Sequence, residues 1–376
     1  MTQFCSLLMT CCLMAFAASV LCEQEKPQHQ HHHNKHNMQH KSGHAHKAHG
    51  PNTHAPIGVM GDHIHAKGQF MMSYRYMKMH MQGNQFGSAT VSSADIVNQF
   101  NNRFSPPTTL RVVPEKMETN MHMLGLMYAP SDTLTLMGMV AHTEKSMLHT
   151  TFSGMSGANV LGQFETQVSG MGDTHLSALY SLFQSKQHAV HANVGLSLPT
   201  GSIVQLDTVL TPMNSQRELR LPYAMQLGSG TYDIEVGTTY NYYANKLNIG
   251  AQAKYKVRTG GNNSQGYQLG NKTSLTTWLG YNVSQSVSIS GRATWSHTDS
   301  ISGIDSNISA PIQTANPDNY GGKMTQVGLG VNYMGHHGVL RGHRFAFEYL
   351  TTQSQQANGL QLSSDNMWVL GYQLGF

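Results

Sequence analysis

Charged residues are scarce in this sequence of 376 residues. Asp, Glu, Lys and Arg make up 11% of it, against roughly 25% in soluble domains. After residue 22 no apolar run approaches the ~20 residues of a membrane-spanning helix. The net charge of +4, with histidine neutral, is small and spread out, so no nucleic acid is expected as a partner. Few charges together with 37 glycines and 16 tyrosines favour a β-rich architecture.

Cysteine is absent after residue 22. The apolar segment 4–22 contains all four, Cys5, Cys11, Cys12 and Cys22. This segment predicts a signal peptide over residues 1–22; because its start carries no Lys or Arg, an uncleaved anchor is the alternative. Removal of the segment would leave almost no thiol, which suits an oxidising compartment and excludes a disulfide framework.

Residues 23–56 contain a histidine-rich run without an apolar face. Ten histidines lie between residues 28 and 54, and His31, His32 and His33 are consecutive. We expect this segment to be disordered. Neutral imidazole binds Zn, Cu and Ni, so the segment is interpreted either as a metal-capturing tail or as a solvated spacer.

Period-two alternation begins at residue 67 and recurs in about twelve runs. Each run is close to or above the ~9–11 residues of a tilted strand that crosses a bilayer. The runs are 67–82, 118–129, 132–144, 172–184, 186–199, 227–242, 245–258, 268–282, 285–298, 322–334, 342–353 and 365–376.

Short and long connections alternate between these runs. The short ones are near 128–132, 184–187, 243–246 and 282–285, and the long ones are 83–117, 145–171, 200–226 and 299–321. This alternation is typical of bacterial outer-membrane barrels, which have short periplasmic turns and long outer loops. We therefore predict an all-β fold: a transmembrane antiparallel up-and-down β-barrel of about twelve strands over residues 57–376. Both termini would be periplasmic.

The last run shows the two faces of such a strand. One face carries Trp368, Leu370, Tyr372, Leu374 and Phe376, and the other carries Met367, Val369, Gly371, Gln373 and Gly375. Large apolar residues would face outer-membrane lipid, and small or polar ones the lumen. The terminal Phe376, with aromatic residues upstream, resembles the signal that the barrel assembly machinery reads.

Methionines are concentrated on the expected lumen face of three neighbouring strands. They are Met77, Met79, Met81, Met121, Met123, Met137 and Met139. Pairing across a turn at 130–131 would bring Met121 and Met123 near Met137 and Met139. Thioethers favour soft ions such as Cu(I), but they also fill narrow interiors as flexible packing, and both interpretations stay open.

Charged side chains follow the lumen face of other strands. They are Asp233, Glu235, Lys254, Lys256, Arg258, Arg292 and Glu348. Facing charges of opposite sign could set a constriction in a pore. The alternative is an internal salt-bridge network that makes the barrel rigid.

The segment Asp62-His63-Ile64-His65 precedes the first strand. In an extended chain His63 and His65 lie on one side, next to Asp62. This is a candidate metal site at the periplasmic mouth, and a polar start of the strand is the alternative.

Catalysis would need a nucleophile and a base at the membrane surface. An outer-membrane phospholipase, which also uses about twelve strands, needs a Ser–His pair, and the third strand offers His142, Ser146 and His149. No local signature accompanies them, so we do not expect an enzyme.

Five segments carry a resemblance to a known family. They are Gly61-Asp62-His63-Ile64-His65, Met72-Ser73-Tyr74-Arg75-Tyr76-Met77, Met121-His122-Met123-Leu124-Gly125, Leu196-Ser197-Leu198-Pro199-Thr200-Gly201-Ser202 and Met225-Gln226-Leu227-Gly228-Ser229-Gly230. They resemble a family of outer-membrane transporters similar to the barrels named for the meta-cleavage pathway of phenol degradation. The resemblance covers roughly residues 57–376 and implies a barrel and a transport function.

The expected function is therefore a channel. A narrow barrel would pass small solutes by diffusion or through a weak binding site, and it requires no cofactor. The alternative is binding or transport of a metal solute (Cu, Zn or Ni), using the His-rich segment and the methionine-lined lumen.

Overall fold

The computed structural model describes residues 50–376. The predicted signal peptide and most of the His-rich segment, including His31, His32 and His33, lie outside the described residues. Within the described part, no helix is both long and apolar enough to span a membrane.

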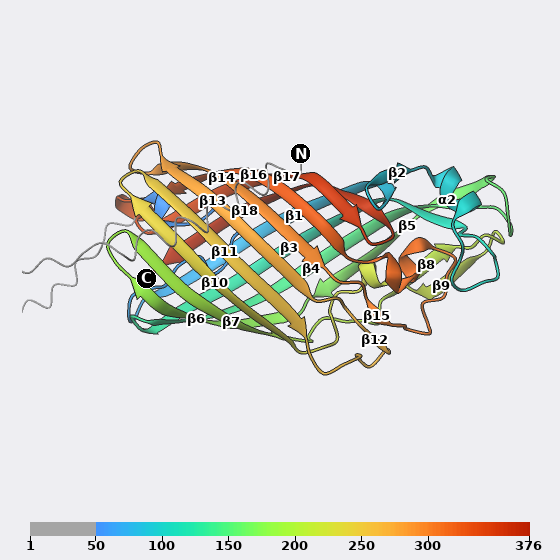
Figure 1. The fold of residues 1–376 in the computed structure, drawn as a ribbon, viewed down its shortest axis with the longest axis horizontal. Coiled ribbons are helices and arrows are strands. Elements are labelled where there is room, and N and C mark those ends of the chain that lie inside the picture. Colours follow the sequence, from blue (N-terminus) through green and yellow to red (C-terminus); the bar gives the residue numbers. More distant parts are fainter. Residues whose placement is uncertain (1–49) are drawn as a thin grey trace, which may run out of the picture. The chain divides into compact units, whose positions relative to one another are not determined.

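Twelve long strands form one closed antiparallel barrel (Figure 1). Consecutive members pair with each other, and the last pairs with the first from Met71–Gly375 to Phe86–Leu360. The fold class and the strand number expected from the sequence are confirmed. The strands are β1 (Phe70–Phe86), β3 (Val112–Ser131), β4 (Leu134–Phe152), β6 (Thr174–Gln184), β7 (His188–Leu198), β10 (Asp233–Ala244), β11 (Leu247–Arg258), β13 (Lys272–Asn282), β14 (Val287–Thr298), β16 (Gly322–Met334), β17 (His343–Ala357) and β18 (Leu360–Gly375).

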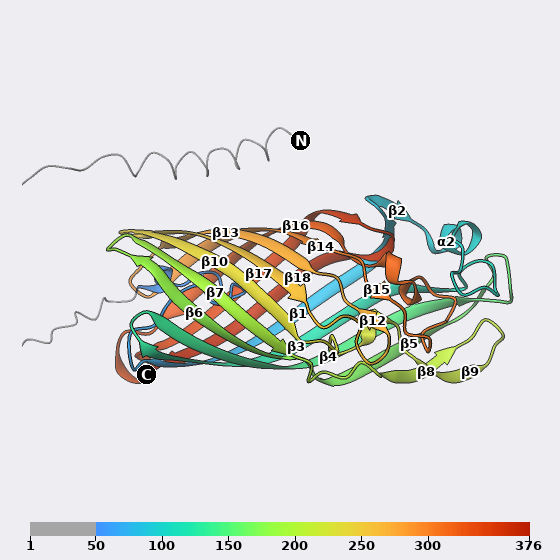
Figure 2. The same ribbon diagram turned by 60° about the horizontal axis from the view of Figure 1, so that its bottom comes forward.

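Smaller elements gather at the end of the barrel that carries the long loops (Figure 2). The strand β5 (Val160–Met171) extends the sheet by pairing with the C-terminal part of β4, from His142 to Phe152. The helix α2 (Ser93–Gln99) begins where the Ser92 side chain accepts a hydrogen bond from the Asp95 backbone N–H, a favoured helix cap. The other elements at this end are β2 (Ala89–Val91), α2 (Ser93–Gln99), β8 (Leu206–Leu210), β9 (Gln216–Arg220), η2 (Tyr223–Met225), β12 (Tyr267–Gln268), β15 (Ser302–Gly303), η3 (Gln313–Ala315) and η4 (Pro317–Asn319).

The connection between β17 and β18 departs from the expected lengths. It consists of residues 358–359 alone, at the long-loop end. The sequence predicts a connection at residues 354–364, between the runs 342–353 and 365–376. Residues 354–357 instead continue β17 and pair with β16, and β18 begins at Leu360. At the opposite end the connection 335–342 contains η5 (Gly338–Leu340).

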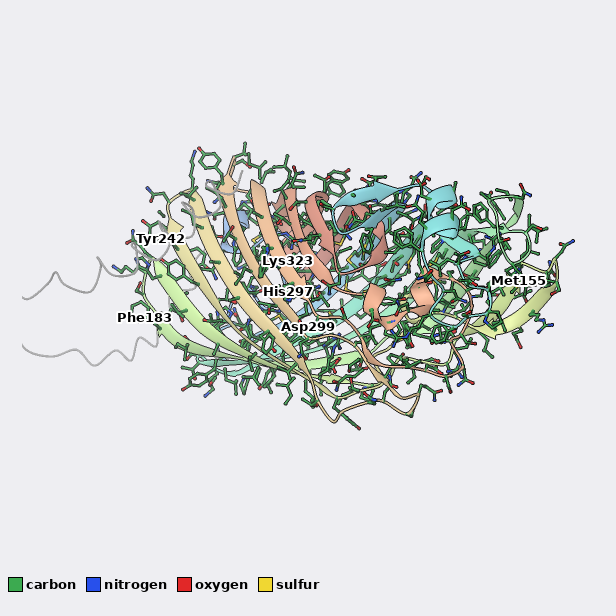
Figure 3. All side chains as sticks on the ribbon, turned by 45° about the vertical axis from the view of Figure 1, so that its right-hand side comes forward. Met155, Phe183, Tyr242, His297, Asp299 and Lys323 are labelled. Atoms are coloured by element: carbon green, nitrogen blue, oxygen red, sulfur yellow. The ribbon has the colours of Figure 1, made fainter. Side chains whose placement is uncertain are left out.

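The two faces of the wall differ as the alternation predicts. Outward side chains are large and apolar, as with Leu329, which is 75% exposed, whereas the inward Asn248 and Thr239 are fully buried. Figure 3 shows Phe183 and Tyr242 at the short-turn end and Met155 at the far tip of the long loops. An apolar exterior edged by aromatic residues is the surface that a bilayer requires of a barrel.

Residues 50–66 run inside the barrel at the short-turn end. Pro51–Thr53 form the short helix η1, and Asn52, Ala55 and Ile57 are buried. The expected boundary at residue 57, with disorder up to residue 56, therefore lies too late in the chain. We call residues 50–66 the plug.

Candidate functional site: the occupied lumen

Three charged side chains of the barrel wall hold the plug backbone. The Arg344 guanidinium donates from Nη2 to the Ala55 carbonyl at 2.7 Å, and Arg75 Nε donates to the Ile57 carbonyl at 3.0 Å. The Gly58 N–H donates to Glu348 Oε2 at 2.9 Å. Hydrogen bonds to charged groups contribute about 1.5–3 kcal/mol each, so these contacts fix the centre of the plug.

Neutral side chains hold the plug from the other side of the barrel. Gln252 Nε2 donates to the Met60 carbonyl at 3.1 Å, and Asn241 Nδ2 donates to the Asp62 carbonyl at 2.8 Å. The Nε2 atom of His191 lies 2.9 Å from the Gly61 carbonyl. With the charged contacts, the plug is held from β1, β7, β10, β11 and β17, so it crosses the lumen.

Apolar packing holds the plug against the wall, where Ile57 fits a recess formed by Ala346, Val369 and Gly371 that we call the socket. Ile57 is 1% exposed and packs against Ala346 and Val369. Gly371 supplies the room: a Cβ there would lie 2.2 Å from Ile57 Cγ1. Across the lumen, Trp278 packs against Ala55 and Val59.

The predicted charged wall forms ion pairs. Lys254 Nζ lies 3.1 Å from Glu235 Oε1, and Arg292 Nε lies 2.7 Å from Glu348 Oε1. Arg258 pairs with Asp233. Lys256 on β11 stands opposite Glu235 of β10 on one side and opposite Lys272 of β13 on the other. The pairing agrees with the salt-bridge interpretation of these residues.

The lumen nevertheless has an excess of positive charge. Among the side chains that alternation directs inward from the twelve strands, together with those of the plug, eight lysines and arginines stand against four carboxylates. Glu115 and Asp365 lie at register irregularities and are not counted. The cations are Arg75, Lys145, Lys254, Lys256, Arg258, Lys272, Arg292 and Arg344, and the carboxylates are Asp62, Asp233, Glu235 and Glu348. Sequence reasoning left Arg344 and Lys272 out, although the alternation that located Lys254 also reaches them.

The methionine rows differ in register from the expectation. Met127 pairs with Met137, whereas Met139 stands opposite Gly125 and Met123 opposite Ala141. The expected pairing of Met121 and Met123 with Met137 and Met139 is therefore wrong. The turn between the two strands lies at residues 132–133 and not at 130–131, and a register irregularity lies between Tyr128 and Ser131. Met77 does pair with Met121, across β1 and β3.

These methionines pack against segments that enter the barrel. Met77 contacts the cluster around Ile57, and Met137 lies with Ile64 beside Met71 and Met127. At the other end, Met81 packs against a cluster of buried residues from the wall and from an inserted loop, namely Met117, Met147, Val168, Leu221, Met225 and Leu362. These contacts favour the packing interpretation of the predicted Met wall and give no support to a Cu(I) path.

Loops pack together and against the wall at the opposite end of the lumen, and we call them the cap. Tyr223 lies at the centre of this cap, with its ring 4.7 Å from that of Tyr267 and 5.7 Å from that of Tyr320. Burial raises the pKa of Tyr267 to about 12, so its phenol stays neutral. The ammonium of Lys145 on the lumen face of β4 donates to the Ala224 carbonyl at 2.8 Å, which holds the cap to the wall.

The short-turn end of the plug carries a cluster of imidazoles. The His63 ring lies 4.6 Å from the ring of His54 and 4.7 Å from that of His65. His63 Nδ1 lies 2.9 Å from Asp62 Oδ1. Burial raises the pKa of the Asp62 carboxyl, but His63, His54 and Arg344 lower it by more, so its pKa lies well below the ordinary value. Sequence reasoning found His63 and His65 but missed His54, because only the folded turn brings it back.

The candidate catalytic residues do not form a catalytic group. His149 is buried and stacks on Phe164, whereas Ser146 and His142 belong to the other face of β4. His142 Nε2 lies 3.1 Å from Ser169 Oγ and 3.9 Å from Glu144 Oε1. A triad needs the acid and the nucleophile on different ring nitrogens, and here both approach the same one.

An apolar groove of about 630 Å³ lies on the barrel wall across β3, β4, β6 and β7. Its lining includes Leu126, Leu136 and Leu176, which are exposed on the outer face. The groove therefore opens on the lipid-facing side and is separate from the plugged lumen.

Comparison with known proteins gives matches among solved structures only: no family model matches the chain, and no curated protein matches it. An outer membrane channel from Pseudomonas putida F1 is 15% identical, with a TM-score of 0.54, over 85% of this chain and 99% of that chain. The β domain of the Bordetella autotransporter BrkA is 9% identical, with a TM-score of 0.44, over 82% of this chain and all (100%) of that one. The Pseudomonas putida toluene transporter TodX is 10% identical, with a TM-score of 0.41, over 82% of this chain and 90% of that chain. The first match confirms, at the level of the fold, the resemblance to outer-membrane transporter barrels: this chain is similar in fold to an outer membrane channel.

Proposed function

We propose that the protein is an outer-membrane channel for small solutes, closed at rest by the plug and by the loop cap. One observation carries the proposal: a barrel with an apolar exterior encloses a polar lumen in which the chain's own segments occupy the path. Wall side chains bind the plug mainly through its backbone, at the Ala55, Ile57 and Met60 carbonyls. The plug can therefore leave and water can take its place, because these donors remain satisfied by water.

The channel works without catalysis, and its short turns face the periplasm. Charge in the lumen sets the class of solute. Eight cations against four carboxylates give the lumen a positive potential, and such a potential concentrates anions in a narrow, low-dielectric passage. The favoured solutes are therefore small anions or molecules with an anionic group.

Current through planar bilayers tests the channel. We would compare the wild type, a variant without residues 50–66, the variant Tyr223→Ala in the cap, and the combination of the two changes. Removal of a buried aromatic side chain such as Tyr223 costs about 3–5 kcal/mol, which is enough to loosen the cap. Stepwise currents that rise in any variant support the proposal. Variants that all carry no more current than the wild type, although gel mobility shows intact barrels, would refute it.

The reversal potential in a KCl gradient tests the solute class. An open variant should prefer chloride to potassium. Replacement of Lys256 and Lys272 by Gln should reduce this preference, because both side chains stand on the lumen face. Lys186→Gln, at an exposed turn, is the matched control and should leave the preference unchanged. A cation preference in the open variant would contradict the anion assignment.

A further inference from the structure

The turn of the plug brings two distant parts of the segment together. The Ala55 N–H donates to Asp62 Oδ2 at 2.8 Å, which closes a loop of the chain. His54 therefore returns beside His63, and ligand atoms of His54, Asp62 and His63 all lie within 4.8 Å of one another.

The carboxylate of Asp62 fixes the orientation of one imidazole. Its Oδ1 lies 2.9 Å from His63 Nδ1, a contact that in the neutral ring favours the tautomer with the proton on Nδ1 and the lone pair on Nε2. That Nε2 atom is buried and makes no hydrogen bond with any other described residue. Metal-binding histidines are commonly held by a carboxylate in this way, and a buried imidazole nitrogen without a donor is poised to bind a cation.

The spacing of the His63 ring from each of its two neighbouring rings suits one metal ion. Nitrogen ligands lie about 2.0–2.1 Å from tetrahedral Zn²⁺, which places the centroids of two bound imidazoles roughly 5 Å apart. The observed separations of 4.6 Å for His54–His63 and 4.7 Å for His63–His65 are close to this value. The ligand atoms of His65 lie outside the 4.8 Å group of His54, Asp62 and His63, so the His65 ring must turn toward His63 for the three rings to share an ion.

The backbone around the cluster is fixed before any ion arrives. The His65 N–H donates to Thr135 Oγ1 at 3.0 Å, and Asn241 Nδ2 donates to the Asp62 carbonyl at 2.8 Å. The Asp62 side chain is 10% exposed and that of His63 14%. Barrel strands thus hold the ligand-bearing segment at the short-turn end of the lumen, from which a hydrated ion could reach it.

We propose that His54, His63 and His65 bind one divalent transition-metal ion of the Zn²⁺, Cu²⁺ or Ni²⁺ class, with Asp62 positioning His63. Imidazole is a preferred ligand of these three ions. The bound ion links the two arms of the plug loop, so it stabilises the seated plug. The site does not depend on the channel function.

Zinc titration of the purified full-length protein against a chromophoric chelator tests the site. The His-rich segment offers a matched control, because His44 and His46 have the same spacing as His63 and His65. We expect His63→Gln/His65→Gln to lose the tightest Zn²⁺ equivalent and His44→Gln/His46→Gln to keep it. Asp62→Asn should weaken that equivalent by about 10–100-fold, as the loss of an orienting carboxylate does elsewhere.

Two outcomes would overturn the proposal. In one, the tightest equivalent survives His63→Gln/His65→Gln in a barrel whose gel mobility is native. In the other, that equivalent disappears in His44→Gln/His46→Gln, which would assign it to the His-rich segment. Zinc binding is measured separately from current. Loss of the metal site would therefore leave the channel proposal untouched, and absence of current would leave the metal proposal untouched.

Discussion

The socket for Ile57 gives the sharpest test of the plug. In Gly371→Ala the added Cβ would lie 2.2 Å from Ile57 Cγ1 and 2.5 Å from Cδ1, whereas carbon atoms in contact stay about 3.5–4.0 Å apart. Cγ1 is bonded to the Cβ of a β-branched side chain with few allowed rotamers, so relief of the clash requires Ile57, and with it the plug, to move. Overpacking of this kind costs about 1–3 kcal/mol, which raises the unseated fraction roughly 5- to 150-fold.

Thiol labelling measures that fraction directly. Val59 in the plug is 4% exposed, and the natural cysteines all lie within residues 1–22. With Val59→Cys as the probe, Gly371→Ala should increase the labelling rate roughly 5- to 150-fold, in proportion to the unseated fraction. Gly291→Ala is the control, because a Cβ at that wall glycine has nothing within 4 Å, and its rate should equal that of the parent.

A double variant separates the socket from a general loss of stability. Ile57→Ala removes the atoms that clash, so adding Gly371→Ala to it should change labelling little. Neighbouring residues in contact are expected to be non-additive. Equal rates for Gly371→Ala and Gly291→Ala, or additive effects of Gly371→Ala and Ile57→Ala, would refute the socket.

Three further predictions concern the wall, the orientation and the methionines. Glu348→Gln leaves Arg292 buried without its partner, because the two side chains are 0% and 7% exposed; it should lower the free energy of unfolding in urea by about 3–5 kcal/mol. The control Glu118→Gln breaks pairs at a side chain that is 25% exposed and should cost at most about 1 kcal/mol; similar values for the two would contradict the buried network. On intact cells an impermeant thiol reagent should label a cysteine at Met155 but not one at Lys186, and the reverse result would invert the orientation. Met77→Leu/Met121→Leu should cost less than about 1.5 kcal/mol per site and leave Cu(I) binding unchanged, whereas a loss of Cu(I) binding would restore the soft-metal path.

The wall of the barrel could be predicted because its physics is local. Alternation at Lys254, Lys256 and Arg258 separates lipid from lumen within a single strand, since one face must avoid hydrocarbon. The same rule gave the faces of the last strand around Trp368. Chain connections of alternating length then set the strand number.

The contents of the lumen could not be predicted in the same way. Residues 50–66 contain Pro, Gly and His without a regular alternation of polar and apolar positions, so no pattern marks them as inserted into the lumen. The one signal for burial is the apolar stretch at Ile57–Met60. Their position depends on partners such as Arg344 and Glu348, about 290 residues away in the sequence. The register of the methionines depended on the position of the turn after β3, which lies at residues 132–133 and not at 130–131.

Current recorded during modification of the plug tests the central claim most directly. In a Val59→Cys/Tyr223→Ala protein held in a planar bilayer, a bulky charged thiol reagent attached to residue 59 cannot return to a site that is 4% exposed in the native chain. The plug should therefore stay out, and current should rise in steps and fall again when a reductant removes the reagent. Complete labelling with no change in current would contradict a channel closed by its own plug.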